Sequence, residues 1–211
     1  MLELNRLYLM DCMEGMAQMP DKYFELCICD PPYGLPKEST HGRGKLKNRI
    51  LNSGGLERWD KKPSPEYFQE LFRVSKNQII WGGNYFDLPP TRGVICWDKC
   101  QPWENFSQWE MAWTSFDKPA SMFKFDNRTT DKIHPTQKPV ALYEWLLKNY
   151  AKPGDKILDT HVGSASSLIA CHKMGFDYLG FEIDEEYYNK AKKRLDEARA
   201  QQTIFGLEGL K

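Results

Sequence analysis

Several features that would assign this sequence to a special class of protein are missing. No apolar run approaches the length of a membrane-spanning helix, and the N-terminus lacks a basic-then-apolar leader. Lys plus Arg and Asp plus Glu number 29 each, so the chain is not a generally basic protein, although a local basic patch is compatible with this balance. We therefore expect a cytoplasmic protein that does not enter a membrane.

Metal-site and phosphate-loop patterns are also missing. The six cysteines include no Cys-x-x-Cys pair, and no second pair completes a tetrahedral site with Cys96 and Cys100, so we expect free thiols and no metal. The lack of Gly-x-Gly-x-x-Gly and of Gly-Lys-Ser/Thr excludes the usual dinucleotide fold and phosphate loop. What is present, 211 residues with 41% apolar and 27% charged, is typical of a single globular domain spanning residues 1–211.

The most informative stretch comes at the end of a short apolar run. Residues 26–29 carry no charged or amide side chain, which predicts a strand buried on both faces. Asp30, Pro31, Pro32 and Tyr33 follow. Because proline lacks an amide hydrogen and pushes the preceding residue out of helical geometry, strand pairing ends here. These residues should then lie at the carboxyl end of a buried strand, where ligands bind in open α/β sheets.

This cluster suits chemistry on the amino group of a flat ring. The lone pair of an aryl amine is delocalised into its ring, and acceptors that bind the amine hydrogens would make it available. Asp30 and the carbonyl of Pro31 or Pro32 are such acceptors, and Tyr33 offers a face on which the ring can stack. A plain turn explains the same residues equally well, so the motif alone does not decide between the two interpretations.

The first part of the chain predicts two strands that end in carboxylates. Residues 6–10 predict a strand that ends at Asp11, and residues 12–19 have apolar side chains at helical spacing before the strand that ends at Asp30. Such a βαβ unit places both carboxylates on one edge of a sheet. Asp11 also suits a helix N-cap, and the two roles are compatible.

The last part of the chain repeats this arrangement. Residues 156–158 predict a strand that ends at Asp159, small residues follow at 163–166, and a strand over 177–181 ends at Glu182. Small residues let the backbone approach a ligand at a helix N-terminus, and an acid about 20 residues further on suits ribose hydroxyls. A ligand with a ribose but no pyrophosphate, such as S-adenosylmethionine, fits this pattern.

Two segments are candidates for contact with nucleic acid. The loop at 34–62 has five Lys or Arg between Lys37 and Arg49 against one acid, which suits phosphate contact, although solvated surface loops have the same composition. The aromatic-containing segment 98–132 is the second candidate for target recognition. The DNA-binding residues that we predict are Arg43, Lys45, Lys47 and Arg49.

The remaining segments alternate between helical and strand patterns. We expect helices over residues 65–74, 139–150, 167–174 and 184–200, a buried strand over 78–81, and an antiparallel pair over 93–97 and 110–114 near the sheet edge.

Together the motifs resemble those of the beta-class S-adenosylmethionine-dependent amino-methyltransferases of DNA. The resemblance covers roughly residues 5–200. Its motifs come in the order of that class, with the catalytic motif at Asp30 first, then residues 134–139, then Asp159 and Glu182. The resemblance implies an α/β fold: a Rossmann-like, mostly parallel, seven-stranded methyltransferase sheet with helices on both faces and a permuted motif order.

The resemblance also implies roles for individual residues. Asp30 and the carbonyls of Pro31 and Pro32 would bind the target amino group, and Tyr33 would stack on the base. In the cofactor site, Asp11 would accept from the adenine, Thr136 and Lys138 would hold the methionine carboxylate, and Glu182 would bind the ribose. The implied S-adenosylmethionine site consists of Asp11, Cys12, Asp30, Thr136, Lys138, Asp159, His161, Gly163, Ser164 and Glu182.

The cofactor loop departs from the family pattern at three positions, Thr160, His161 and Ala165. The family often has Asp-Pro-Phe-x-Gly-Ser-Gly, whereas residues 159–165 read Asp-Thr-His-Val-Gly-Ser-Ala. Ala165 has less backbone freedom than the glycine that it replaces. His161 replaces an aromatic residue and can still pack flat against the cofactor; a role as catalytic base is less favoured.

The reaction implied by the resemblance is methyl transfer from S-adenosylmethionine to N6 of adenine in double-stranded DNA after base flipping, leaving S-adenosylhomocysteine. Asp at the first motif position favours adenine, because Ser is commoner there for cytosine. The alternatives are N4 methylation of cytosine, methylation of a protein glutamine, and a nucleic-acid-binding protein that has lost catalysis. We expect a prokaryotic or phage-infected cell; the recognition sequence, the choice between monomer and homodimer, and the role in restriction, phage protection or regulation stay open.

Overall fold

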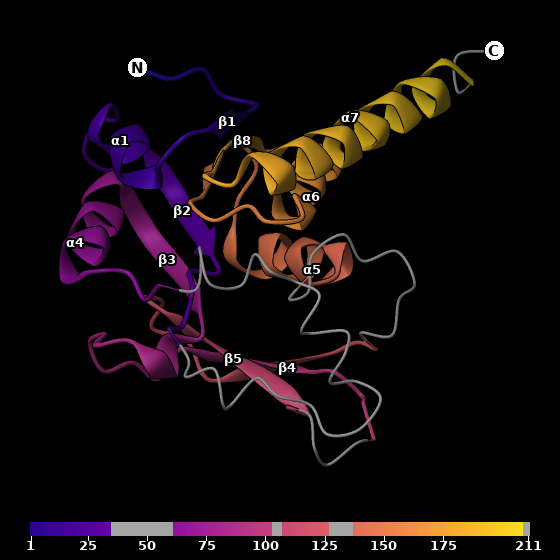
Figure 1. The fold of residues 1–211 in the computed structure, drawn as a ribbon. Coiled ribbons are helices and arrows are strands. Elements are labelled where there is room, and N and C mark those ends of the chain that lie inside the picture. Colours follow the sequence, from indigo (N-terminus) through magenta and orange to yellow (C-terminus); the bar gives the residue numbers. More distant parts are fainter. Residues whose placement is uncertain (35–60, 103–106, 127–136, 209–211) are drawn as a thin grey trace, which may run out of the picture.

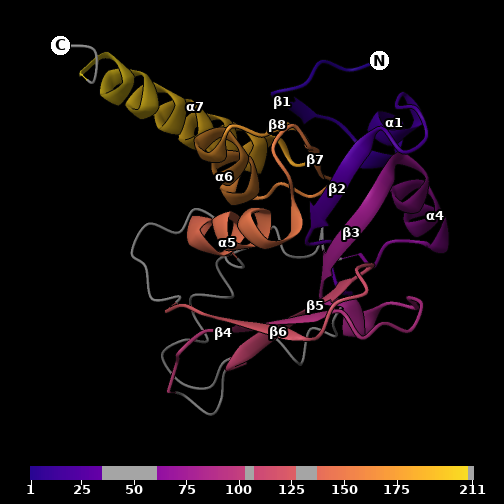
Figure 2. The same ribbon diagram turned by 180° about the vertical axis from the view of Figure 1, so that it is seen from behind.

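A computed structural model of the chain describes residues 1–34, 61–102, 107–126 and 137–208. In these ranges eight strands form one sheet (Figures 1 and 2). They are β1 (Arg6–Leu9), β2 (Phe24–Cys29), β3 (Ser75–Trp81), β4 (Val94–Asp98), β5 (Trp109–Thr114), β6 (Ser121–Lys124), β7 (Lys156–Asp159) and β8 (Asp177–Glu182). Their spatial order is β1-β8-β7-β2-β3-β5-β4-β6.

Parallel pairing dominates the sheet. Strands β1, β8, β7, β2 and β3 run parallel to one another, β5 is antiparallel to β3 and β4, and β6 pairs in parallel with β4 at the far edge. The central strands are short apolar runs that are buried on both faces, as parallel strands between helical layers require. The predicted mostly parallel sheet is confirmed, and β6 makes it one strand wider than the seven predicted.

Helices cover both faces of the sheet. They are α1 (Cys12–Ala17), α4 (Pro65–Val74), α5 (Val140–Tyr150), α6 (Ser166–Met174) and α7 (Glu185–Glu208), with a short 3-10 helix, η3 (Gly83–Tyr85). In Figure 1, α1 and α4 lie on one side of β2 and β3, whereas α5, α6 and α7 lie on the other. Two apolar cores result, one under α1 and α4 and one under α5, α6 and α7.

The strand register brings four acidic residues to one edge of the sheet. Asp11 follows β1 and Asp30 follows β2, whereas Asp159 and Glu182 are the last residues of β7 and β8. In the register of the sheet, Leu9 of β1 is paired with Glu182 of β8. Asp159 of β7 is paired with Gly180, which precedes Glu182 by two residues. The predicted βαβ unit at the start of the chain is present, but β8 and β7 lie between its two strands.

Element boundaries follow the sequence patterns closely. Pro65 lies at the start of α4, and Pro139 is the N-cap residue of α5, both positions that tolerate a missing amide hydrogen. The antiparallel pair β4 and β5 is confirmed. The last helix is longer than expected and runs to Glu208 rather than 200. None of the described helices combines the length and apolar character that crossing a membrane requires.

Candidate active site

The carboxylate of Asp30 is fixed by two donors, one three residues away and one from a distant part of the chain. The Tyr33 hydroxyl donates to Oδ1 over 2.6 Å, and the ammonium of Lys138 donates to Oδ2. Because a carboxylate has about four lone-pair sites, both oxygens can still accept a further hydrogen bond. Asp30 is therefore oriented while remaining an acceptor for a ligand.

Lys138 is the most deeply buried charge of this cluster. Only 3% of the residue is exposed, and its ammonium lies 3.0 Å from Glu110 Oε2 and 5.1 Å from the centre of the Trp81 ring. Burial lowers the pKa of a lysine, but attraction to Asp30 and Glu110 outweighs it, so the pKa of Lys138 is raised. The ammonium stays charged between two carboxylates.

Glu110 on β5 completes the network, and the sequence analysis did not identify it. Its carboxylate pairs with Lys138 and, over 2.5 Å, with Lys99. Burial raises the pKa of Glu110, but the two lysines more than compensate and lower it to about 2. No local signal marks this residue, because its functional partner lies 28 positions further along the chain.

The Tyr33 ring is held by the segment that follows β3. A Cβ atom on Gly82 would lie 2.2 Å from Cε1 of Tyr33, so only glycine lets the ring lie this close to the backbone. The Tyr33 ring stacks on Tyr85 with centroids 4.9 Å apart and packs edge-on against Phe86. Burial raises the pKa of Tyr33, so its hydroxyl is a neutral donor.

Asp159 and Glu182 order the loop between β7 and α6. Buried Asp159 accepts from the His161 amide over 3.0 Å and from the Ser167 hydroxyl, and Glu182 accepts from the Gly163 amide over 2.9 Å. Burial raises the pKa of both carboxyls, that of Asp159 to about 7. The loop is thus tied to the ends of two neighbouring strands.

His161 is a neutral, fixed side chain in this loop. Its Nδ1 lies 3.0 Å from the Thr160 hydroxyl, which in turn contacts the Tyr67 hydroxyl over 2.7 Å. The ring also packs edge-on against Tyr67. Burial lowers the pKa of His161 to about 4, although Asp11 acts in the opposite direction. This environment favours packing over proton transfer near neutral pH.

Asp11 performs the local role that the sequence allowed for it. Its carboxylate accepts from the Met13 amide over 2.7 Å and caps α1. The neighbouring Cys12 thiol is partly buried, and its pKa is raised to about 12, first by burial and then by Asp11. A contact with a ligand adenine stays a prediction for both residues.

The predicted site residues fall into two groups within the described structure. Asp30, Tyr33 and Lys138 are in direct contact, with Pro31 buried and Pro32 partly buried beside them. Asp159, His161, Gly163 and Glu182 form the connected loop, and the Ser164 hydroxyl lies 3.0 Å from that of Ser166. Thr136, Arg43, Lys45, Lys47 and Arg49 lie outside the described residues, as do loop 34–62 for the most part and parts of segment 98–132.

Lys138 makes contacts other than the expected one. The resemblance implied that it holds the methionine carboxylate of the cofactor, whereas here it pairs with Asp30 and Glu110. The described residues contain no group of three or more His, Cys, Asp or Glu side chains placed to hold a metal ion.

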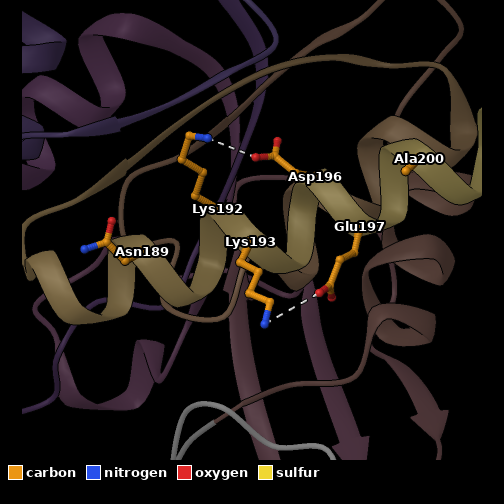
Figure 3. A pocket seen from close by; sticks show the side chains of 6 residues that line it. All are labelled: Asn189, Lys192, Lys193, Asp196, Glu197 and Ala200. Atoms are coloured by element: carbon orange, nitrogen blue, oxygen red, sulfur yellow. Dashed lines mark hydrogen bonds and ion pairs between the residues drawn. The ribbon is translucent and has the colours of Figure 1, made fainter.

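A surface hollow away from these residues is formed by α7 alone. Figure 3 shows its lining, which consists of Asn189, Lys192, Lys193, Asp196, Glu197 and Ala200. The two lysines are paired along the helix, with Asp196 and Glu197 respectively. One helix surface with its charges already paired lacks the converging walls of a ligand site.

Known proteins of similar sequence are methyltransferases. A model of the family described as DNA methylase, of the N6/N4 type, matches residues 97–193. The chain is 26% identical to the type II methyltransferase M.HinfI of Haemophilus influenzae, over 93% of this chain and 69% of that protein. In sequence, this chain is similar to the N6 and N4 DNA methylases.

Solved structures of other proteins share the fold of this chain. The M1.HpyAVI–SAM complex superposes with a TM-score of 0.59 at 20% identity, covering 90% of this chain and 98% of that chain. The cytosine-N4-specific PvuII DNA methyltransferase gives a TM-score of 0.61 at 14% identity, covering 89% and 85%. The resemblance predicted from the sequence is confirmed for the N6/N4 group as a whole, and these relatives do not separate adenine from cytosine.

Replacing Gly82 should displace Tyr33. An alanine at φ +67° costs about 1–2 kcal/mol for the left-handed backbone and about 1–3 kcal/mol more for the clash with the ring. Gly175→Ala is the matched control, because Gly175 has φ +75° and nothing within 4 Å of a new Cβ. We expect urea unfolding to show a clearly larger loss of unfolding free energy for Gly82→Ala; equal losses would contradict the packing of Tyr33 on Gly82.

Asp159 and His161 should have opposite effects on the pH dependence of stability. Asp159, with its pKa raised to about 7, keeps a proton that the unfolded chain loses above pH ~4, so its contribution to stability falls as pH rises. His161, with its pKa lowered to about 4, excludes a proton that the unfolded chain binds below pH ~6.5, so its contribution rises with pH.

Each variant should therefore expose the effect of the other residue. Between pH 4.5 and 6.5, Asp159→Asn should make unfolding free energy increase with pH more steeply than in the wild type, by up to ~1.4 kcal/mol per pH unit, and His161→Gln should do the reverse. Urea unfolding at several pH values measures both slopes. Slopes parallel to the wild type in both variants would mean that neither group has a shifted pKa.

Proposed function

We propose that the chain is an S-adenosylmethionine-dependent DNA methyltransferase that methylates N6 of adenine in double-stranded DNA after the base leaves the helix. The observation that carries this proposal is the position of the Asp30 carboxylate. Tyr33 and Lys138 orient it at the carboxyl ends of the strands, next to the β7–α6 loop. We also infer a single domain and a cytoplasmic location, as bacterial type II relatives suggest.

The residues of the β7–α6 loop fit the cofactor. Glu182 is an acid at the end of a buried strand, a position that suits binding of ribose hydroxyls. The loop beside it contains small residues, and the amide of one of them, Gly163, donates to Glu182. Asp11, Asp159, His161, Gly163 and Ser164 would line the rest of the site. S-adenosylmethionine, when bound, supplies an electrophilic methyl group. Thr136 and Lys138 remain our proposed contacts to its carboxylate.

The target clamp follows from the acceptors at the end of β2. Asp30 and the carbonyls of Pro31 and Pro32 accept hydrogen bonds from the exocyclic amine and so favour a nitrogen whose lone pair is available. Tyr33, whose hydroxyl is bonded to Asp30, stacks on the flipped base and recovers part of the few kcal/mol that flipping costs. Most of the rate enhancement then comes from positioning and from the negative charge of Asp30 beside a nitrogen that becomes positive.

Glu110 supports this clamp by balancing Lys138. Without Glu110 the buried ammonium would have Asp30 as its only carboxylate partner among the described residues, and the Asp30 oxygens would be drawn toward the lysine and away from the amine. With Glu110 present, the Lys138 ammonium is shared between two carboxylates, so its pull on the Asp30 oxygens is weaker. The proposed DNA contacts of Arg43, Lys45, Lys47 and Arg49 would bind phosphates around the flipped base.

Cytosine N4 is the second candidate target. The same acceptors hold any exocyclic amine, and the PvuII enzyme, which shares the fold, is cytosine-N4-specific. The Asp at the first motif position is what favours adenine.

The proposal predicts which base becomes methylated. Incubation with labelled S-adenosylmethionine and plasmid DNA, followed by nucleoside analysis, should yield N6-methyladenine. Asp30→Ala should reduce methylation by about 10²–10³-fold or more, because it removes the charge beside the reacting nitrogen, and should leave cofactor binding partly intact in calorimetry. Asp117→Asn, an exposed aspartate paired with Arg92, is the control.

The outcomes of this experiment are distinct. N4-methylcytosine would overturn the adenine assignment and retain the methyltransferase. Cofactor binding by the wild type with no modified base would indicate a protein that has lost catalysis, and near-normal activity in a folded Asp30→Ala variant would remove Asp30 from the mechanism.

Glu110→Gln should reduce turnover while leaving cofactor affinity nearly unchanged. Breaking a buried ion pair costs about 3–5 kcal/mol of stability, so the fold of the variant is checked first. Glu25→Gln is the matched control. Glu25 also pairs with two lysines, and its side chain is 22% exposed against 25% for Glu110, but it lies at the amino end of β2, away from Asp30. A loss of kcat that is equal in both variants would show that Glu110 acts only through general stability.

A further inference from the structure

The loop that the proposed function places against the cofactor contains a strained residue. Ala165 has φ 60° and ψ 18°, the left-handed conformation that is unfavourable for every residue with a Cβ atom. It is also the N-cap residue of α6 and has no side-chain atom that could accept from the first turn. An alanine is therefore a poor choice at this position unless contacts elsewhere hold the loop.

Arg194 on α7 supplies such contacts on both sides of Ala165. Its Nη1 donates to the Ser164 carbonyl over 2.6 Å and to the Ser166 hydroxyl over 2.9 Å. The Ser166 hydroxyl also lies 3.0 Å from that of Ser164. One guanidinium thus connects the residue before Ala165 with the residue after it.

Arg194 occupies this place at an electrostatic disadvantage. It is partly buried, and among the residues that the structure describes no carboxylate forms an ion pair with it. Its charge also lies beside the N-terminus of α6, where the helix dipole disfavours a cation. Strained residues persist where the surrounding structure holds them in place, and they cluster at functional sites.

The opposite end of the loop is fixed by the same stretch of chain. Glu182, the last residue of β8, accepts from the Gly163 amide over 2.9 Å, and α7 begins three residues later. One continuous segment therefore carries both anchors, a carboxylate for Gly163 and a guanidinium for Ser164 and Ser166.

We propose that Arg194 is a positioning residue for the binding of S-adenosylmethionine. Arg194 holds loop 163–166 in its binding shape and compensates for the alanine at position 165, where a glycine would be unstrained. This inference rests on the proposed function of the loop. It predicts energetic coupling between Arg194 and Ala165: once residue 165 is a glycine, the loop can adopt its shape with less help.

The test is a double-mutant cycle on the full chain, with cofactor affinity measured by calorimetry. Arg194→Met should raise the Kd for S-adenosylmethionine by about tenfold, equivalent to ~1.4 kcal/mol. Ala165→Gly alone should change the Kd by less than about twofold, and adding Arg194→Met to Ala165→Gly should raise it by no more than about threefold.

Arg199→Met is the matched control. Arg199 also lies on α7, five residues beyond Arg194, and ties the helix to the sheet through the Tyr178 hydroxyl over 2.7 Å and the Asn5 carbonyl over 2.8 Å. This variant should lower the thermal midpoint but leave the Kd within about twofold, because it loosens the helix and not the loop.

Three results would overturn the inference. Wild-type affinity in Arg194→Met would show that the loop needs no support. A double variant as weak as Arg194→Met alone would show that Ala165 is not what Arg194 compensates for, and an equal loss in Arg199→Met would reduce the role to anchoring α7. If instead the wild type bound no S-adenosylmethionine, the proposed function of the loop would fail first.

Discussion

A single buried ammonium, that of Lys138, constrains the part of the molecule around Asp30. Lys138 is 3% exposed and lies between Asp30, which follows β2, and Glu110 on β5. Removing an ammonium from water costs several kcal/mol, and the two carboxylates offset much of this cost. The end of β2, strand β5 and the segment before α5 must therefore meet at one point. That requirement fixes the Asp30 carboxylate more firmly than a turn after a strand would.

The two halves of the sheet edge handle charge differently. Around Asp30, opposite charges alternate, and Glu110, with its pKa lowered to about 2, stays ionised. In the β7–α6 loop, burial dominates the titration: it raises the pKa of Asp159 to about 7 and lowers that of His161 to about 4. The charged half suits a nitrogen that gains positive charge, whereas the other half suits a ligand held by packing and backbone contacts.

Departures from a family pattern are informative where the structure shows what compensates for them. Ala165 keeps a backbone conformation that favours glycine, and Arg194 holds the residues on either side of it. His161 stands where an aromatic residue is common, and its contacts with Thr160 and Tyr67 keep it in place as a neutral ring. In both cases contacts from neighbouring groups hold the altered part of the loop in place.

The sequence by itself determined most of the elements and the acids at their carboxyl ends. Apolar runs, the prolines at 31, 65 and 139, and helical spacing are local signals, and they placed Asp30, Asp159 and Glu182 at strand ends. Only the tertiary structure decided that β8 and β7 separate β1 from β2, that Glu110 faces Lys138, and that Arg194 reaches Ser164. The reason is physical. A pattern of a few residues indicates which face of a helix or strand is buried. A contact between residues 28 or 30 positions apart depends on how the strands and helices are arranged in space.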